Sequence, residues 1–216
     1  MHDSFVHRGK RKILVDYLRE KCGIADEAVL KAMMEVPRHL FIESIFEEFA
    51  YEDRAFPIAA HQTISHPSTV AEQSELLQLI PGEKVLEIGT GCGYQTAVLM
   101  QMGGLVYTVE RQKDLFDYSK DMFRKLHVRP KFQSFGDGFA GLPTFAPFHK
   151  IIVTCGAENL PAELLRQLKV GGKMVIPLGP LEEQILYRFT KISLTEFEKE
   201  EFGAYKFVPM LGSTNK

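Results

Sequence analysis

Short apolar runs alternate with helix-like segments from about residue 84 onward. The strand candidates are Val85–Ile88, Leu105–Val109, Lys131–Phe135, Lys150–Thr154 and Lys173–Pro177. The segments between them include Lys113–Leu126 and Pro161–Leu168, in which apolar residues recur at helical spacing. Alternation of this kind predicts an α/β fold whose doubly wound, mostly parallel sheet has helices on both faces.

The first third of the chain has mainly helical patterns. Ile13, Leu14 and Leu18 recur at helical spacing, and a second helix is expected between a cap at Asp26 and Pro37. The stretch 38–49 suggests another short helix, and 51–65 suggests loops or short extended pieces. A further helix is expected over 67–79, because Pro81-Gly82 breaks the pattern there.

Two late apolar runs, Gln184–Thr190 and Tyr205–Val208, are not separated by a predicted helix. They predict antiparallel strands at one edge of the sheet. We expect the residues 212–216 to be frayed.

The chain of 216 residues is long enough for one domain with a sizeable core. We expect a single domain over 1–216: an N-terminal helical part that caps the substrate (1–80), a cofactor-binding core (81–180), and C-terminal strands with a tail (181–216).

Composition narrows the class of protein. Hydrophobic residues make up 45% and charged residues 25%, which is ordinary for a soluble globular protein, and the formal net charge of -2 argues against a nucleic-acid partner. No secretory signal or membrane-spanning run is apparent. The three isolated cysteines, Cys22, Cys92 and Cys155, lack zinc-ligand spacing and fit a reducing compartment. We therefore expect a cytoplasmic protein without bound metal or membrane partner. We also expect a monomer, although nothing in the composition determines the oligomeric state.

The most informative stretch is the glycine-rich turn after the first strand candidate, Gly89-Thr90-Gly91-Cys92-Gly93. Glycine permits a positive φ and lets a ligand approach the main chain closely. A helix that begins near Tyr94 would direct free N–H groups into this gap. Glu110 ends the second strand candidate, where an acid can accept hydrogen bonds from ribose hydroxyls. Together these features indicate a cofactor of the adenosine type.

The spacing of the glycines narrows the choice of cofactor. A dinucleotide fingerprint needs glycine at the sixth position, where this chain has Tyr94, and no phosphate-binding G-x-x-x-x-G-K-[ST] motif occurs. The remaining pattern, G-x-G-x-G with an acid at Glu87, is similar to the S-adenosylmethionine loop of class I methyltransferases. The alternative is a tight strand-to-helix turn in an α/β protein with another ligand.

Polar or glycine-rich clusters follow four of the strand candidates, at 89–93, 110, 136–138 and 154–156. In an open parallel sheet these positions share one crevice. Asp137 is predicted to accept a hydrogen bond from the adenine amino group, with Gly138 leaving room for the ring. The alternative for Asp137 is a turn in which its carboxylate binds its own backbone. No histidine stands next to Cys92 or Cys155 in the sequence, so we do not expect a nucleophilic cysteine.

The polar segment 61–67 precedes a predicted helix. If Pro67 is the first helical residue, the cap falls on His66, and capping does not explain Ser65. This favours a functional hydroxyl at Ser65. His61 and His66 are candidates for a general base, with solvated side chains as the simpler expectation.

Several motifs occur together in the order of one known family. They are Pro37-Arg38 with Phe41, Gln62-Thr63-Ile64-Ser65-x-Pro67, Val85 to Gln95, Val109-Glu110-Arg111, Gly136-Asp137-Gly138, Ala146-Pro147-Phe148 and Leu168-Lys169-x-Gly171-Gly172. From about Ile13 to Gly179 the chain resembles the protein-L-isoaspartate O-methyltransferases, with a Rossmann-like methyltransferase fold. A weaker match to the family follows at Phe207-Val208-Pro209.

The resemblance implies transfer of a methyl group from S-adenosylmethionine, leaving S-adenosylhomocysteine, to the free α-carboxylate of isoaspartyl or D-aspartyl residues in damaged proteins and peptides. The ester then collapses to a succinimide, which starts repair. Ser65 matches the active-site serine of the family. The residues matched to cofactor binding are Gln62, Thr63, Ile64, Gly89, Thr90, Gly91, Cys92, Gly93, Glu110, Asp137 and Gly138.

The chain departs from the family pattern at three places. Ala59-Ala60-His61 replaces glycine-rich residues, Cys92 replaces a serine, and 154–156 replaces an alanine-rich stretch. The segment 180–201 has no confident match. The alternatives left open are a methyltransferase for a small molecule or RNA, and a module that binds the cofactor without catalysis.

Overall fold

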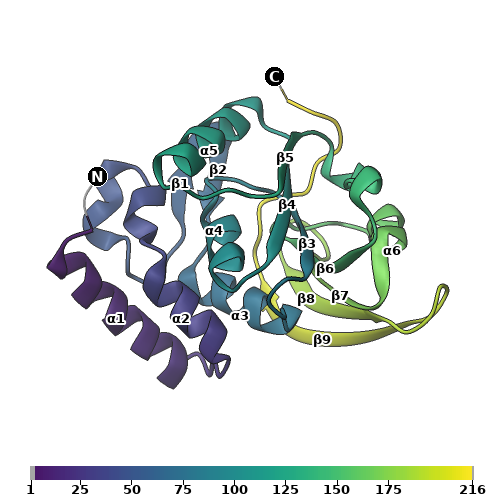
Figure 1. Cartoon of the computed structure of the whole chain (residues 1–216), viewed down its shortest axis with the longest axis horizontal. Coiled ribbons are helices and arrows are strands. Elements are labelled where there is room, and N and C mark those ends of the chain that lie inside the picture. The colour runs from purple at the N-terminus through teal and green to yellow at the C-terminus, as the bar shows by residue number, and fades with distance from the viewer. Residues whose placement is uncertain (1–2, 216) are drawn as a thin grey trace.

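A seven-stranded mixed sheet forms the centre of the fold in the computed structural model, which describes residues 3–215 (Figure 1). Its strands are β3 (Lys84–Ile88), β4 (Leu105–Glu110), β5 (Phe132–Phe135), β6 (Phe148–Val153), β7 (Leu168–Leu178), β8 (Gln184–Lys191) and β9 (Phe197–Tyr205). The order across the sheet is β5-β4-β3-β6-β7-β8-β9, parallel from β5 to β7 and antiparallel from β7 to β9. The predicted fold class is confirmed.

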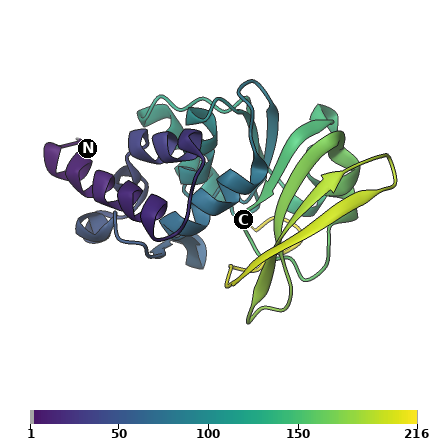
Figure 2. The ribbon, with the colours of Figure 1, turned by 90° about the horizontal axis from the view of Figure 1, so that it is seen from below.

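Helices cover both faces of this sheet (Figure 2). The α-helices are α1 (Phe5–Glu20), α2 (Glu27–Glu35), α3 (Pro67–Leu77), α4 (Tyr94–Gln101), α5 (Lys113–Lys125) and α6 (Ala162–Gln167). The 3-10 helices are η1 (Arg38–Phe41), η2 (Ser44–Phe49), η3 (Ala59–His61), η4 (Gly138–Ala140) and η5 (Pro143–Phe145). On one face α3, α4 and α5 contact the strands, with α1 and α2 packed outside them, and α6 contacts the sheet from the other face.

Alternation along β3 explains why both faces are covered. Val85 is buried in a core with residues of α1 to α5, whereas Leu86 and Ile88 are buried in a second core with residues of α6. Successive side chains of a strand point to opposite faces, so a strand buried on both sides reads as a continuous apolar run.

The order of the strands creates a crevice. From β3 the chain crosses to β4 on one side, and later returns to β6 on the other side of β3. This reversal leaves a gap beyond the carboxyl ends of the strands, where open α/β sheets bind ligands. A small hairpin, β1 (Phe56–Ile58) and β2 (Gln62–Ile64), leads directly into α3.

The expected helix starts are present. The side chain of Asp26 accepts hydrogen bonds from Ala28 N (2.8 Å) and Val29 N (3.4 Å), which satisfies two amides of the first turn of α2. Pro67 is the first residue of α3, as expected. Among residues 3–215, no helix is long and apolar enough to cross a membrane.

Three expectations about local structure need correction. The strand expected at Tyr205–Val208 is wrong, because β9 runs from Phe197 to Tyr205 and the chain leaves the sheet there. Residues 38–49 form two 3-10 helices in place of one short helix. The tail is bonded up to Asn215, whose N donates to Arg111 O at 2.8 Å, so fraying is wrong for 212–215. Lys216 lies outside the described residues.

Candidate active site

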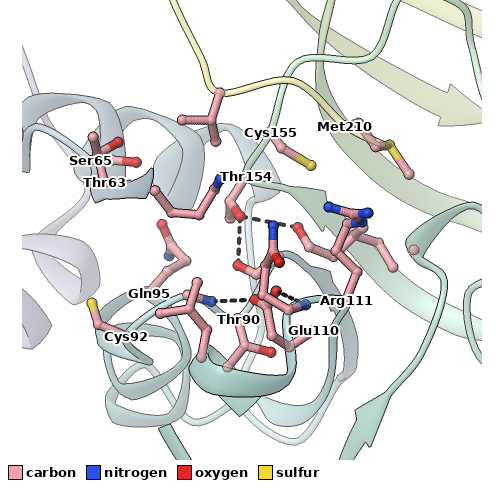
Figure 3. A pocket seen from close by; sticks show the side chains of 18 of the residues that line it. Thr63, Ser65, Thr90, Cys92, Gln95, Glu110, Arg111, Thr154, Cys155 and Met210 are labelled. Carbon is pink, nitrogen blue, oxygen red and sulfur yellow. Dashed lines mark hydrogen bonds between the residues drawn. The ribbon is translucent and has the colours of Figure 1, made fainter. Parts of the chain in front are cut away.

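A cavity that is open to solvent lies at the carboxyl ends of the central strands. The loops after β3, β4 and β6 line it, together with the β1–β2 hairpin on one side and the C-terminal segment 208–211 on another. Figure 3 shows Thr63 and Ser65 on one side of this cavity and Glu110 with Arg111 on the other. We call it the cofactor cavity below.

The glycine loop has the conformation that its sequence requires. Gly89, Gly91 and Gly93 all have positive φ, at 95°, 55° and 90°. A Cβ at Gly89 would lie 2.5 Å from Thr154 Oγ1, and one at Gly93 would lie 2.4 Å from the ring of Phe123. Side chains at these positions would therefore clash with the neighbouring elements, and the bare main chain forms the wall of the cavity.

Glu110, the last residue of β4, forms a hydrogen bond with this loop. Its Oε2 accepts a hydrogen bond from Gly91 N and its Oε1 accepts one from Gln112 N, both at 2.8 Å. Burial raises the pKa of the Glu110 carboxyl above its usual range, against the opposing effect of these amide donors. Each carboxylate oxygen has a further lone pair, so Glu110 can also accept from a ligand in the cavity.

Gln95 supplies a second acceptor. Its Nε2 donates to Ser74 Oγ at 2.8 Å, while its Oε1 is buried and has no partner within the described part of the chain. An unpaired buried polar atom costs free energy, so we expect a bound ligand to donate a hydrogen bond to Gln95 Oε1. Gln95 and Glu110 both line the cavity, and they fit a cofactor that carries an ammonium group and ribose hydroxyls.

Ser65 stands between the hairpin and α3, with its side chain half-buried. Its hydroxyl has no hydrogen-bond partner within residues 3–215, whereas its carbonyl accepts a bond from Arg38 Nη2 at 2.7 Å. The backbone of Ser65 is thus fixed while its hydroxyl stays available to a ligand.

Most of the predicted site residues line the cofactor cavity. They are Gln62, Thr63, Ile64, Ser65, Gly89, Thr90, Gly91, Cys92, Glu110 and Gly138. Gly93 is not part of the lining and begins α4 as its N-cap. Asp137 is also not part of it. Its Oδ1 accepts from Phe139 N and its Oδ2 from Ser213 N, both at 2.9 Å. The cofactor contacts of these residues remain predictions.

Several lining residues were not among those predicted, and they include Tyr94, Gln95, Arg111, Thr154, Cys155 and the segment 208–211. Thr154 and Cys155 follow β6, a position that had indicated the shared crevice. The tail is held across the cavity by distant contacts, such as Arg111 Nε donating to Ser213 O at 3.1 Å. Only the weak match at Phe207-Val208-Pro209 had indicated the segment 208–211.

The thiols in the cavity are unsuited to nucleophilic attack. Burial raises the pKa of Cys92 to about 11 and that of Cys155 to about 12, so both are protonated at neutral pH. His61 and His66 are exposed, and neither lines the cofactor cavity.

A second cavity, which we call the outer groove, adjoins the first. The two share Thr63, Ser65, Thr154 and Val208 in their linings. The remaining lining residues of the groove are Ala55, His66, Ser68, Thr69, Ala204, Tyr205, Lys206 and Phe207. Ser65 therefore lies where two cavities meet.

Comparison with known proteins gives a consistent result. Residues 9–215 match the family model for protein-L-isoaspartate(D-aspartate) O-methyltransferase (PCMT). The chain is 55% identical to the protein-L-isoaspartate O-methyltransferase of Christiangramia forsetii and 55% identical to that of Flavobacterium johnsoniae, in each case over 100% of both chains.

Solved structures agree with the sequence relatives. One protein-L-isoaspartate O-methyltransferase superposes with a TM-score of 0.84 at 30% identity, over 94% of this chain and 66% of that one. A Plasmodium falciparum protein described as a putative protein-L-isoaspartate O-methyltransferase, in complex with S-adenosyl-L-homocysteine, has a TM-score of 0.80 at 25% identity, over 95% of this chain and 98% of that one. The chain belongs to the protein-L-isoaspartate (D-aspartate) O-methyltransferase family.

Proposed function

We propose that this chain transfers a methyl group from S-adenosylmethionine to the free α-carboxylate of L-isoaspartyl or D-aspartyl residues in damaged proteins and peptides. The observation that carries the proposal is the position of Ser65 at the junction of the cofactor cavity and the outer groove. A methyl donor in the first and a peptide in the second would meet at this hydroxyl. The resulting methyl ester can close to a succinimide and start repair.

The residues of the chain fit this reaction without a general base. The substrate carboxylate is ionised at neutral pH, so no proton has to be removed before attack. S-adenosylmethionine, when bound, supplies a methyl group on a positively charged sulfur. Ser65 would donate a hydrogen bond to one carboxylate oxygen and keep the other oxygen directed into the cofactor cavity. Positioning of this kind can lower a barrier by about 7–11 kcal/mol in favourable cases.

We assign the cofactor contacts to the residues predicted for them. Glu110 would accept from the ribose hydroxyls, the main chain over 89–93 would lie against the amino-acid tail, and Asp137 with Gly138 would receive the adenine. The unpartnered Oε1 of Gln95 supports a contact with the ammonium group. The hairpin residues 62–64 would close over the cofactor.

We also propose that the enzyme is a cytoplasmic monomer without nucleic-acid or membrane partners. The net charge of -2 weighs against a nucleic-acid partner, and the three isolated cysteines fit a reducing compartment.

The test is methyl transfer from radiolabelled S-adenosylmethionine to an isoaspartyl peptide, to the same peptide with normal aspartate, and to bulk RNA. We expect base-labile label on the isoaspartyl peptide alone. Label on RNA, or on neither peptide, would contradict the proposal.

A further inference from the structure

The outer groove is lined by polar side chains and one cation, without an acid among the described residues. Within residues 3–215, no carboxylate side chain lines it, and the hydroxyl-bearing residues Thr63, Ser65, Ser68 and Thr69 do. Thr154 also lines it, but its hydroxyl donates to Gly89 O at 2.7 Å. Lys206 contributes its one permanently charged side chain. Hydroxyl donors together with a cation form a surface that favours anionic groups.

Lys206 belongs to the segment just after β9 that lines the groove, whereas Ser65 belongs to the segment between the hairpin and α3. The backbone on its C-terminal side is held in place, because Phe207 N donates to Gln184 Oε1 and Gly156 N donates to Val208 O, both at 2.8 Å. The Lys206 side chain is exposed, and its ammonium forms no ion pair or hydrogen bond in the described part of the chain. The ammonium of Lys206 is thus unpaired, and the backbone that carries it is held by hydrogen bonds.

Two acids contact residues that line the groove, and both accept hydrogen bonds within the protein. Asp53 accepts a hydrogen bond from Ser68 N at 2.8 Å, and Glu72 accepts one from the hydroxyl of Tyr205. Neither carboxylate lines the groove, so they do not cancel the cation there by direct pairing. A ligand with an acidic group would find Lys206 unpaired.

Position separates Lys206 from the reacting carboxylate. The four residues shared by the two cavities mark the place of methyl transfer, and Lys206 is not one of them. A long flexible side chain in the groove, outside the residues shared with the cofactor cavity, can reach the flank of a bound peptide. The flank of an isoaspartyl peptide carries the side chains of the neighbouring residues.

We propose that Lys206 is a specificity-determining residue that recognises an acidic side chain next to the isoaspartyl residue of the substrate. This inference rests on the proposed methyl transfer. Exposed ion pairs contribute little, so the expected preference is roughly two- to fivefold in KM. It should weaken as salt screens the pair.

The test uses isoaspartyl peptides with Glu or Gln at the position before or after the isoaspartyl residue. We expect the parent enzyme to have the lower KM for the Glu peptide of at least one pair, with the same kcat for both members. Lys206→Gln should remove the preference, Lys206→Arg should keep it, and Lys206→Glu should reverse it. Lys31→Gln, at an exposed lysine of α2, is the matched control and should behave like the parent.

Three outcomes would overturn the inference. They are equal KM values for Glu and Gln peptides in both pairs, a preference that survives in Lys206→Gln, and an equal loss of activity toward every peptide, which would place Lys206 on the reacting carboxylate. Binding of fluorescein-labelled peptides, measured by anisotropy without methyl donor, separates this inference from the proposed function. If the Glu peptide binds more tightly than the Gln peptide but neither is methylated, the inference about Lys206 is supported and the proposed methyl transfer is contradicted.

Discussion

The guanidinium of Arg38 holds the carbonyl of Ser65 at 2.7 Å. The same side chain donates to Ala50 O at 3.0 Å and to Arg54 O at 3.1 Å, and it lies over the ring of Tyr94, 5.0 Å from its centre. Arg38 is fully buried and has no ion pair within residues 3–215. One cation thus joins the N-terminal part of the chain, the segment of the proposed catalytic serine and a wall of the cofactor cavity.

Arg38→Lys should therefore affect both stability and turnover. Lysine keeps the charge, but its single ammonium cannot reach all three carbonyls that the planar guanidinium of Arg38 binds. We expect the free energy of unfolding to fall by about 2–4 kcal/mol, since hydrogen bonds to a buried charge are lost. At a temperature where the variant stays folded, we expect kcat to fall more than cofactor affinity does. Denaturant unfolding, calorimetry and steady-state kinetics measure the three quantities.

The matched control is Arg54→Lys, because Arg54 is exposed and its guanidinium pairs with Glu52 at 3.1 Å. It should leave stability and kcat close to the parent values. An Arg38→Lys enzyme with parental kcat would show that the bond to Ser65 does not position the hydroxyl.

Removal of the Ser65 hydroxyl tests its proposed role in orienting the substrate. Ser65→Ala should bind S-adenosylmethionine with parental affinity and lose methyl transfer by roughly ten- to hundredfold, as expected for one hydrogen bond to a charged group. Calorimetry and the radiolabel assay provide the two readouts. Equal turnover by variant and parent would refute the role.

Glu110→Ala tests the proposed contact with the ribose. We expect cofactor affinity to weaken by roughly 1–3 kcal/mol, because a buried acceptor is lost. The variant also frees Gly91 N, which Glu110 holds at 2.8 Å, so thermal unfolding should be followed in parallel. Glu198→Ala, at an exposed acid of β9, is the control and should bind as the parent does. Unchanged affinity in Glu110→Ala means that Glu110 does not contact the ribose.

The positive φ of Ala60 gives a prediction about the loop that precedes the proposed catalytic segment. Ala60 and His61 have φ of 57° and 55°, a region that costs a residue with a Cβ about 1–2 kcal/mol. Ala60→Gly should therefore raise the free energy of unfolding slightly, despite the greater freedom of glycine in the unfolded chain. Ala28→Gly, at an exposed position with ordinary helical backbone in the first turn of α2, should lower it. Destabilisation of the same size by both changes would show that Ala60 is not strained.

Local patterns were sufficient to predict the strands β3 to β8 and the glycine loop, because β3, β4 and β6 are mostly buried and clear breaks separate the strands. The strand β9 was missed for a physical reason. It lies at the edge of the sheet and carries charged residues such as Glu198 and Glu200, which protect an edge from pairing with other chains but hide the apolar alternation. One of them pairs across the strands, with Arg188 Nη2 2.6 Å from Glu200 Oε1.

The wall of the cavity formed by the tail depends on contacts that no local pattern contains. Ser213 N reaches Asp137 Oδ2 at 2.9 Å, and Asn215 Nδ2 reaches Gln112 Oε1 at 2.7 Å. In each case the fold brings together residues that are far apart in the sequence. The same holds for Arg38, which the motif marked without indicating that it would hold Ser65.

Glu87 gives the last prediction, on how stability depends on pH. Burial raises the pKa of its carboxyl from 4.5 to about 7, against a hydrogen bond donated by Thr96, and its Oε1 has no partner within residues 3–215. The folded state therefore binds the proton more tightly than the unfolded state, and the fold loses stability as pH rises from about 4.5 to about 7. The full loss above that range is about 3 kcal/mol. Glu87→Gln cannot ionise, so at pH 8 it should be more stable than the parent, and the difference should shrink to less than about 1 kcal/mol near pH 5. Urea unfolding of both proteins across this range measures the effect, and a gain of equal size at both pH values would exclude titration of Glu87 as its cause.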